Sequence, residues 1–238
     1  TQQPAPVEET FNLLKQASAC PSCGHKIRAW ENIPVISYLL QKGKCSGCGV
    51  GISAQYPLVE LTTGLLSLVV AWHYGYSWQG LAALGFTWAL VTLTVIDFNT
   101  QLLPDNITYP LLWAGLLINL NGTFVDHTSS LLGAVFGYLA LWSVFVLFKL
   151  VTGKEGMGHG DFKLLAALGA WAGWQVLPLI VILSSVVGAV VGVILIRFRN
   201  HEQGSPMPFG PFLAVAGWIA LLWGEPLIDA YLRMVGMK

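Results

Sequence analysis

Long apolar runs separated by short polar junctions constrain this chain more than any other feature. From Pro57 onward several runs reach about 18 residues or more, the length that indicates a helix crossing a bilayer. Charged residues make up only 10% of the chain, less than half of the roughly 25% that is usual in soluble domains. The sequence therefore predicts an all-α fold, a polytopic transmembrane helical bundle in contact with membrane lipid.

The apolar runs divide into helices at the polar junctions. The expected spans are 57–74, 79–96, 106–121, 131–151, 162–173, 175–196 and 208–223, with a terminal piece at 226–236. The long run from Phe162 to Ile196 is expected to break at Gly173-Trp174-Gln175. Its first half is shorter than the roughly 20 residues of a full span. We therefore expect that helix to be shielded by its neighbours or to open onto a watery cleft. The helices at 79–96 and 162–173 are expected to pack side by side at their cytoplasmic ends, because small residues on both permit close backbone approach. These residues are Ala82, Ala83 and Gly85 on the first and Ala166, Ala167, Gly169 and Ala170 on the second.

All four cysteines lie before residue 50, in a polar stretch unlike the rest of the chain. They form two Cys-x-x-Cys pairs, Cys20 with Cys23 and Cys45 with Cys48, separated by 21 residues. Four thiolates from two such pairs can close a tetrahedron around one Zn²⁺, and a complete set of four ligands is typical of a structural site. The alternative is a pair of redox-active or structural disulfides.

Basic residues beside the cysteines favour zinc over disulfides, because Lys and Arg accumulate on the cytoplasmic, reducing side of a membrane. The flanking residues are Lys26, Arg28, Lys42 and Lys44. The expected organisation is a flexible polar lead-in at 1–18, a small cytoplasmic four-cysteine zinc-binding domain at 19–56 and a transmembrane domain at 57–238. The segment 30–40, between the cysteine pairs, is too short to span a membrane. It is expected to pack on the zinc site or to lie at the membrane surface.

The placement of positive charge orients the helices. If the cysteine region is cytoplasmic, ten of the twelve Lys and Arg residues fall on the cytoplasmic side, and only Arg233 and Lys238 do not. This asymmetry is what the positive-inside rule predicts. It puts Asp97, Asp105 and Asp161 at the same, cytoplasmic, membrane face. The formal net charge of zero carries no information about nucleic acid, and no nucleic-acid partner is expected.

The three aspartates carry the candidate chemistry, because an ionisable side chain at the edge of a membrane span is costly and is by default functional. Two carboxyls that share a site resist joint ionisation, so one keeps its proton and polarises a carbonyl. The other takes a proton from the water that attacks that carbonyl, which is aspartic proteolysis. Asp97 ends a predicted helix and is the better catalytic candidate. Asp105, which follows Pro104 and opens a helix, suits an N-cap or a supporting role.

Asp161 lies in a glycine-rich junction, Gly156-Met157-Gly158-His159-Gly160-Asp161-Phe162-Lys163. Gly158 and Gly160 have no Cβ atoms, and we expect them to let a substrate backbone approach the Asp161 carboxyl. Lys163 has two interpretations, a contact to an acidic substrate residue or a lysine whose stem snorkels at a helix start, and the second is favoured. His159 is interpreted as incidental.

Two other classes of function remain as alternatives. A proton- or cation-coupled transporter would use the aspartates as a relay, and it predicts further charges along a path and internal repeats. The predicted spans are almost free of charge, and no convincing repeat is visible. A membrane-anchored binding module acting through its zinc knuckles would not need aspartates aligned at one face.

Several motifs together resemble the type IV prepilin peptidase family. The aspartate motifs are Asp97 with Leu102-Leu103-Pro104-Asp105, and Gly158-His159-Gly160-Asp161. The twin Cys-x-x-Cys region is similar to that of bacterial members, as are three further elements: Trp30-Glu31-Asn32-Ile33-Pro34, Gln55-Tyr56-Pro57-Leu58-Val59-Glu60 and Pro208-Phe209-Gly210-Pro211-Phe212. The sequence begins at Thr1 without an initiator Met, and the family's usual first membrane helix is expected to have preceded it.

The resemblance implies a bacterial inner-membrane endopeptidase of the Gly-x-Gly-Asp type. Such enzymes cut the basic leader from prepilins or pseudopilins on the cytoplasmic side. Many bacterial members then methylate the new N-terminal amine with S-adenosylmethionine. The family's catalytic pair corresponds to Asp97 and Asp161 here, and its zinc-region cysteines correspond to the four cysteines of this chain.

Some questions stay open at this level. Glu60, early in the first span, is interpreted either as a partner for a basic residue of the zinc region or as a group that holds an amine for methyl transfer. No Gly-x-Gly-x-x-Gly motif follows a strand, so a Rossmann-type methyltransferase domain is not expected and the cofactor site is unassigned. Whether the substrates belong to a pilus or to a secretion system, and how many copies assemble, does not follow from the sequence.

Overall fold

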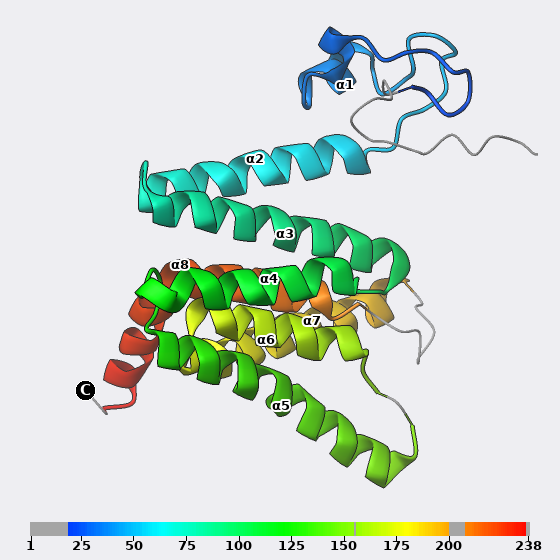
Figure 1. Ribbon diagram of the computed structural model, residues 1–238. Coiled ribbons are helices and arrows are strands. Elements are labelled where there is room, and N and C mark those ends of the chain that lie inside the picture. The colour runs from blue at the N-terminus through cyan, green and yellow to red at the C-terminus, as the bar shows by residue number, and fades with distance from the viewer. Residues whose placement is uncertain (1–18, 155, 200–207, 237–238) are drawn as a thin grey trace, which may run out of the picture. The chain divides into compact units, whose positions relative to one another are not determined.

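The computed structural model describes residues 19–154, 156–199 and 208–236 (Figure 1). Regular structure in these residues is helical apart from two isolated bridges, Ala19 with Lys26 and Lys44 with Gly51. The all-α prediction is confirmed. The chain forms two compact units, one up to Gly64 and one from Leu65 onward, and the expected lead-in at 1–18 lies outside the described residues.

The first unit, called the cysteine unit below, contains a 3-10 helix at Ala29–Asn32, helix α1 (Ile36–Leu40) and the first half of α2 (Gln55–Tyr74). Each Cys-x-x-Cys pair lies in a turn closed by the same two backbone hydrogen bonds. In the first turn the Cys20 N–H donates to the His25 carbonyl and the Gly24 N–H to the Cys20 carbonyl. The second turn repeats this pattern from Cys45, so the two turns are equivalent knuckles.

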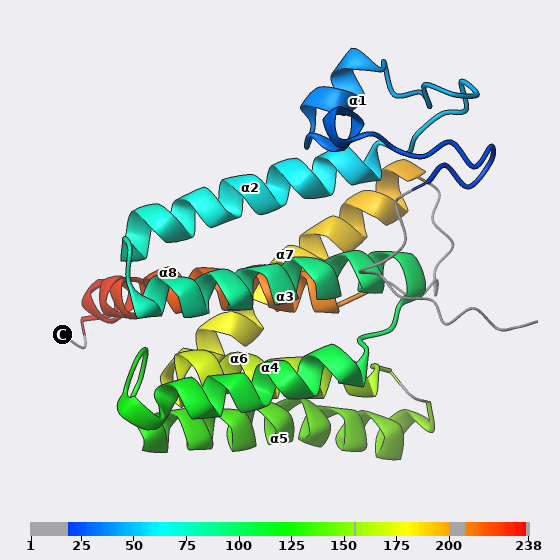
Figure 2. The ribbon, with the colours of Figure 1, turned by 45° about the horizontal axis from the view of Figure 1, so that its top comes forward.

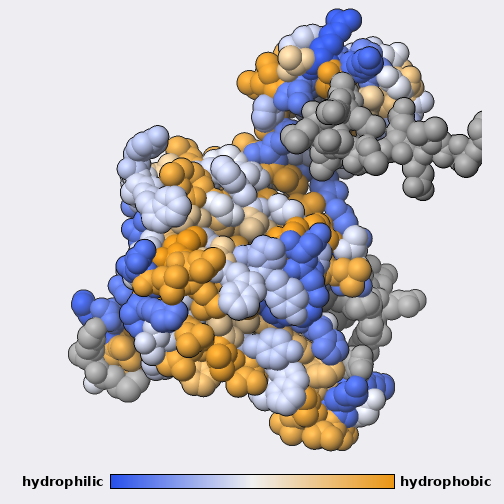
Figure 3. Space-filling view, in the orientation of Figure 1, coloured by the Kyte–Doolittle hydropathy of each residue, from blue (hydrophilic) through white to orange (hydrophobic). Residues whose placement is uncertain are grey.

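The second unit, called the helical unit below, begins in α2 and continues with six further α-helices. They are α3 (Trp78–Thr100), α4 (Asp105–Ile118), α5 (His127–Thr152), α6 (His159–Ala172), α7 (Leu177–Arg199) and α8 (Gly210–Met234). Within the described residues, four helical segments are long and apolar enough to cross a membrane: Trp78–Thr100, His127–Thr152, Trp174–Leu195 and Gly210–Met234. Hydrophobic residues cover much of the face of this unit seen in Figure 3, as expected of a surface that contacts lipid.

Most predicted helices are present, with one correction at the C-terminal end. The break at Gly173 is confirmed, since its φ of 84° lies where residues with a Cβ are rarely found. The separate terminal piece at 226–236 is wrong, because α8 continues through Pro226 to Met234. Proline is tolerated in membrane helices, where neighbouring groups can satisfy the carbonyl that it leaves without a donor.

Helix α6 forms the centre of the helical unit. It packs most extensively against α5, then against α4 and α8 (Figure 1, Figure 2). Every residue from Asp161 to Ala172 except Lys163 is buried. Its 14 residues span about 21 Å at 1.5 Å per residue, less than the roughly 30 Å of a bilayer core. Its neighbours therefore shield it, which is one of the two arrangements expected from its short apolar run.

Glycines on α5 set the closest helix contact. Gly133 and Gly169 face each other so closely that a Cβ on either would collide with the other's backbone carbonyl. One turn further along α5, a Cβ on Gly137 would lie 2.6 Å from the Leu165 carbonyl oxygen. The Gly133-x-x-x-Gly137 spacing thus lets the α5 and α6 backbones approach, as small residues do in membrane helix pairs.

A different helix pair was predicted from the sequence. Small residues on 79–96, namely Ala82, Ala83 and Gly85, were expected to pack against those on 162–173. Instead Ala83 belongs to a cluster with Val70 and Leu222, and Gly85 has no atom within 4 Å of a built Cβ. Helix α3 packs mainly on α8 and meets α6 through large side chains, such as the rings of Phe86 and Trp171, 4.8 Å apart. The prediction of a small-residue α3–α6 contact is wrong.

Side chains of neighbouring segments form hydrogen bonds with the C-terminal end of α6. The buried Asn119 amide donates to the carbonyls of Ala170 and Trp171 at 2.9 and 3.1 Å, and the Ser130 hydroxyl also donates to Ala170. The Trp171 indole donates to the Leu111 carbonyl at 2.8 Å. Carbonyls at a helix end lack intrahelical partners, so these bonds fix one end of α6 and thereby position Asp161 at the other.

We expect Gly133→Ala to destabilise the helical unit by about 1–3 kcal/mol, the usual cost of overpacking. The new methyl group would meet α6 backbone, which cannot rotate away as a side chain can. Thermal unfolding of the detergent-solubilised protein measures the effect. Gly64→Ala is the matched control, since a Cβ there has no atom within 4 Å. Equal unfolding temperatures for the two variants would contradict the observed α5–α6 contact.

Candidate active site and metal centre

Asp97 lies in the last turn of α3, with its side chain directed toward the start of α8. The helix ends at Gln101, whose φ of 55° is left-handed and whose N–H donates to the Asp97 carbonyl. Asp97 is 4% exposed, and its Oδ2 accepts the backbone N–H of Gly210 at 3.0 Å. Gly210 is the first residue of α8, where the unsatisfied N–H groups of a helix favour a negative charge.

Asp161 lies in the first turn of α6 and is also buried. Its backbone N–H donates to the Gly158 carbonyl at 3.3 Å, which forms the turn that starts the helix. Gly160, the residue before Asp161, packs against Leu103, and so does Gly210, whose N–H binds Asp97. The fold therefore brings together the two aspartates that the sequence singled out, from the end of one helix and the start of another.

Leu103 packs between Gly160, which precedes Asp161, and Gly210, which binds Asp97. A Cβ on Gly160 would lie 2.7 Å from the Leu103 Cβ, and one on Gly210 would lie 3.2 Å from its Cδ1. Leu103 thus occupies the space beside Gly160 that we expected to be open for substrate, and that expectation is wrong. A Cβ on Gly158 would meet only the Asp161 Oδ2, at 3.8 Å, so space remains beside that glycine.

Lys163 and Asp105 form an ion pair, with Nζ 2.6 Å from Oδ1. The ammonium also lies 5.0 Å from the centre of the Tyr109 ring. Asp105 is the first residue of α4, and the residue before it, Pro104, is the N-cap without a side-chain bond. Neither the capping interpretation of Asp105 nor the snorkelling interpretation of Lys163 describes this contact. The pair joins the starts of α4 and α6, and because Asp105 is largely exposed it contributes at most about 1 kcal/mol.

Sequence reasoning missed two contributors to this site. Gly210 was noted only as part of the motif Pro208-Phe209-Gly210-Pro211-Phe212. Its N–H bond to Asp97 could not be predicted, because it depends on the three-dimensional position of the start of α8. The Gly133-x-x-x-Gly137 spacing was a readable signal for a close helix pair, and it positions α6. His159 lies against the rings of Phe145 and Phe162, in a packing position away from the aspartate bonds.

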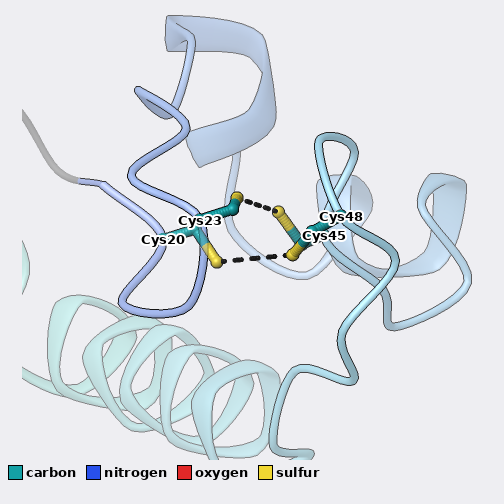
Figure 4. A group of neighbouring side chains, drawn as sticks. All are labelled: Cys20, Cys23, Cys45 and Cys48. Carbon is teal, nitrogen blue, oxygen red and sulfur yellow. Dashed lines mark hydrogen bonds between the residues drawn. The ribbon is translucent and has the colours of Figure 1, made fainter.

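The four cysteines form one cluster (Figure 4). Their sulfur atoms all lie within 4.8 Å of one another, and all four thiols are free. Cys20 and Cys23 come from one knuckle and Cys45 and Cys48 from the other, with their sulfurs directed at each other. Such a group can bind a metal ion, and a set of four thiolates suits a tetrahedral site.

A hydrogen-bonded network beside the cluster links the knuckles. The Glu31 carboxylate accepts the Arg28 backbone N–H at 2.7 Å, contacts His25 Nε2 at 3.2 Å and accepts the Ser46 hydroxyl. The Arg28 N–H bond and the Ser46 bond lower the pKa of Glu31 to about 2. Glu31 is therefore ionised near neutral pH. Because Glu31 belongs to the segment 30–40 and binds residues of both knuckles, this segment packs on the cysteine cluster, which is one of the two positions expected for it.

Together the fold and the site define a helical membrane protein with a buried aspartate pair and a separate cluster of four cysteines. Residues 84–193 match the type IV leader peptidase family, and residues 4–74 match the bacterial peptidase A24 N-terminal domain. The chain belongs to the type IV leader peptidase family. No solved structure matches it.

Curated relatives resemble the chain over nearly its whole length. A Pseudomonas aeruginosa protein named prepilin leader peptidase/N-methyltransferase is 60% identical over 236 residues, which are 99% of this chain and 81% of that protein. A Stutzerimonas stutzeri protein of the same name is 60% identical over 96% of this chain and 79% of its own length. The Pseudomonas putida relative is 57% identical over 98% and 81%, respectively. The resemblance inferred from the motifs is thereby confirmed.

Proposed function

We propose that the chain is a bacterial inner-membrane aspartic endopeptidase that removes the leader peptide of type IV prepilins or pseudopilins, and then methylates the new N-terminus. The observation that carries this proposal is the buried pair of Asp97 and Asp161, which lie at two helix ends joined through Leu103 and Gly210. The names of the relatives supply the substrate class and the second activity. Nothing observed favours the transporter alternative.

In this mechanism the two carboxyls share the acid and base roles. Asp97 is the ionised base, because the Gly210 N–H and the start of α8 favour a negative charge on its carboxylate. It takes a proton from the attacking water. Asp161, to which no side-chain hydrogen bond is assigned within the described residues, carries the proton that polarises the scissile carbonyl. Burial keeps bulk water away, so these polar interactions are stronger than they would be at a surface.

The proposed site faces the cytoplasm. Lys149 is in the last turn of α5 and Lys163 lies just after the first turn of α6, at the end of the helical unit where Asp97 and Asp161 lie. Near the opposite helix ends, Asp126, Glu225 and Asp229 line one cavity, and no Lys or Arg is among the described residues that line it. Arg233, in the last turn of α8, is a basic residue at that opposite end. The remaining distribution agrees with the positive-inside rule.

Purified enzyme, a prepilin and S-adenosylmethionine test the proposal in one assay. The intact mass of the product is expected to fall by the leader and then rise by one methyl group. Omitting S-adenosylmethionine should leave cleavage unchanged and remove only the methyl increment. An uncut prepilin in the presence of folded enzyme would contradict the proposal.

We also propose that the four-cysteine cluster holds one structural Zn²⁺. Four thiolate ligands leave no open position, so the ion would stabilise the cysteine unit without taking part in peptide cleavage. We expect one zinc per chain by elemental analysis of reduced protein, and loss of most of it in Cys45→Ser. Lys44→Ala is the control, because its exposed side chain is outside the cluster. Zinc-free reduced wild-type protein, or two disulfides, would refute the site.

A further inference from the structure

A cavity of about 510 Å³ lies within the cysteine unit. Its wall is made by the knuckles, by α1 and by the first turns of α2. Cys20 and Cys45 line it, whereas Cys23 and Cys48 do not, so the cavity extends away from the metal cluster on one side. Its volume is within the range of about 300–1,000 Å³ that is usual for small-molecule sites.

The charge of the wall favours a positively charged ligand. Among the described residues that line the cavity there are two carboxylates, Glu31 and Glu60, and no Lys or Arg. The one histidine among them, His25, is paired with Glu31. With a divalent ion bound, the charge of the four thiolates would still exceed that of the ion, so the cluster as a whole would be negative. Tyr38 and Tyr56 contribute aromatic surface, which attracts a cation placed over the ring.

The two carboxylates differ in how many of their oxygens already accept a hydrogen bond. Both oxygens of Glu31 are engaged, by the Arg28 N–H and His25 on one side and by Ser46 on the other. Glu60 accepts a single bond through Oε2, from the Val35 N–H at 2.8 Å. Its Oε1 has no assigned hydrogen-bond partner within the described residues and lies on a side chain that lines the cavity.

The bond to Val35 also fixes where Glu60 points. Val35 has a φ of 61°, a costly conformation for a β-branched residue that persists only where the surroundings hold it. The N–H that this conformation presents binds the carboxylate, so the start of α1 is tied to α2. Glu60 is thus held in place before any ligand arrives, which lowers the cost of binding.

We propose that this cavity binds S-adenosylmethionine and that Glu60 is the anionic partner of its cationic groups. The inference rests on the methylation in the proposed function and names a site for it. When bound, the methyl donor lets the neutral N-terminal amine form an N–C bond as the S–C bond breaks, with that electron pair returning to sulfur. Positive charge would pass from sulfur to nitrogen, and Glu60 would supply the negative charge that offsets it.

Glu60→Gln tests the assignment, because the amide oxygen can still accept the Val35 N–H while the charge is lost. Equilibrium dialysis with radiolabelled S-adenosylmethionine should show a loss of affinity of roughly tenfold or more, since hydrogen bonds to charged groups are worth about 1.5–3 kcal/mol. Binding of S-adenosylhomocysteine, which lacks the sulfonium charge, should weaken less. Zinc content and leader cleavage should stay at wild-type levels, and the product should be cleaved but poorly methylated.

Two further variants complete the test. Tyr56→Ala removes an exposed ring that lines the cavity and should also weaken S-adenosylmethionine binding. Gln55→Ala, on the neighbouring residue outside the lining, should bind and methylate like the wild type. Wild-type affinity in Glu60→Gln would overturn the cavity assignment and leave the proposed function intact. A wild-type enzyme that cleaves but neither binds nor uses S-adenosylmethionine would refute the proposed methylation, and the cavity assignment with it.

Discussion

Asp97→Asn and Asp161→Asn are each expected to abolish leader cleavage while the chain stays folded in the membrane. Asparagine has nearly the same shape, and its amide oxygen can still accept the Gly210 N–H at position 97. What disappears is the ability to take or hold a proton. A single general acid or base contributes typically 10²–10⁴-fold, so the rate of cleavage should fall by more than about 10²-fold in either variant.

Two other aspartates serve as matched controls for this result. Asp105→Asn should be milder, because Asp105 is exposed and its observed role is an ion pair with Lys163. Asp126 caps α5 by accepting the Ser129 N–H, a bond that asparagine can also make, so Asp126→Asn should cleave normally. Cleavage rates measured by gel shift on the same prepilin compare all four variants. Cleavage at the wild-type rate by Asp97→Asn or Asp161→Asn would contradict the assignment of these aspartates as catalytic.

Gly210→Ala is expected to reduce cleavage by roughly 10²-fold, the cost of displacing a reacting group by about 1 Å. A Cβ at this position would lie 2.6 Å from Asp97 Oδ2 and 3.2 Å from its Cγ. The carboxylate would have to move away, and its bond to the Gly210 N–H would be lost or lengthened. The loss should appear in kcat with little change in KM, because the new methyl group displaces a catalytic group.

Gly85→Ala is the matched control for Gly210→Ala, because a Cβ on Gly85 has no atom within 4 Å. It should cleave like the wild type. A Gly210→Ala enzyme with normal kcat would show that the α8 start does not position Asp97. A raised KM with normal kcat would indicate that Gly210 contributes to substrate binding and does not position the Asp97 carboxylate.

The sequence predicted the elements of this fold better than their packing. Apolar run lengths and the Gly173 break gave nearly every helix, since both are local properties of the chain. The contact between α5 and α6 was not predicted, although Gly133 and Gly137 carry a visible small-residue spacing. Several helices of this chain carry small residues at similar spacing, and only the three-dimensional arrangement selects which pair meets.

For the candidate site, the sequence predicted the aspartates but not the residues that contact them. Asp97 and Asp161 could be selected from charge placement alone, because membrane segments contain so few ionisable residues. The partners of these aspartates could not. Gly210 reaches Asp97 and Leu103 fills the space beside Gly160 only through contacts between distant segments. For the same reason, the ion pair of Asp105 with Lys163 replaced the two separate roles expected for them.

The most direct test of the central claim is whether residues 97 and 161 lie within reach of each other in the membrane. In the Asp97→Cys/Asp161→Cys double variant, a short bifunctional thiol reagent should link α3 to α6. Because the four native cysteines also carry free thiols, mass spectrometry after proteolysis should identify the peptide in which residues 97 and 161 are joined. An Asp97→Cys/Asp126→Cys pair, at opposite ends of the helices, should not crosslink. If both cysteines of the first pair react with a monofunctional reagent and still fail to crosslink, the two aspartates do not form one site.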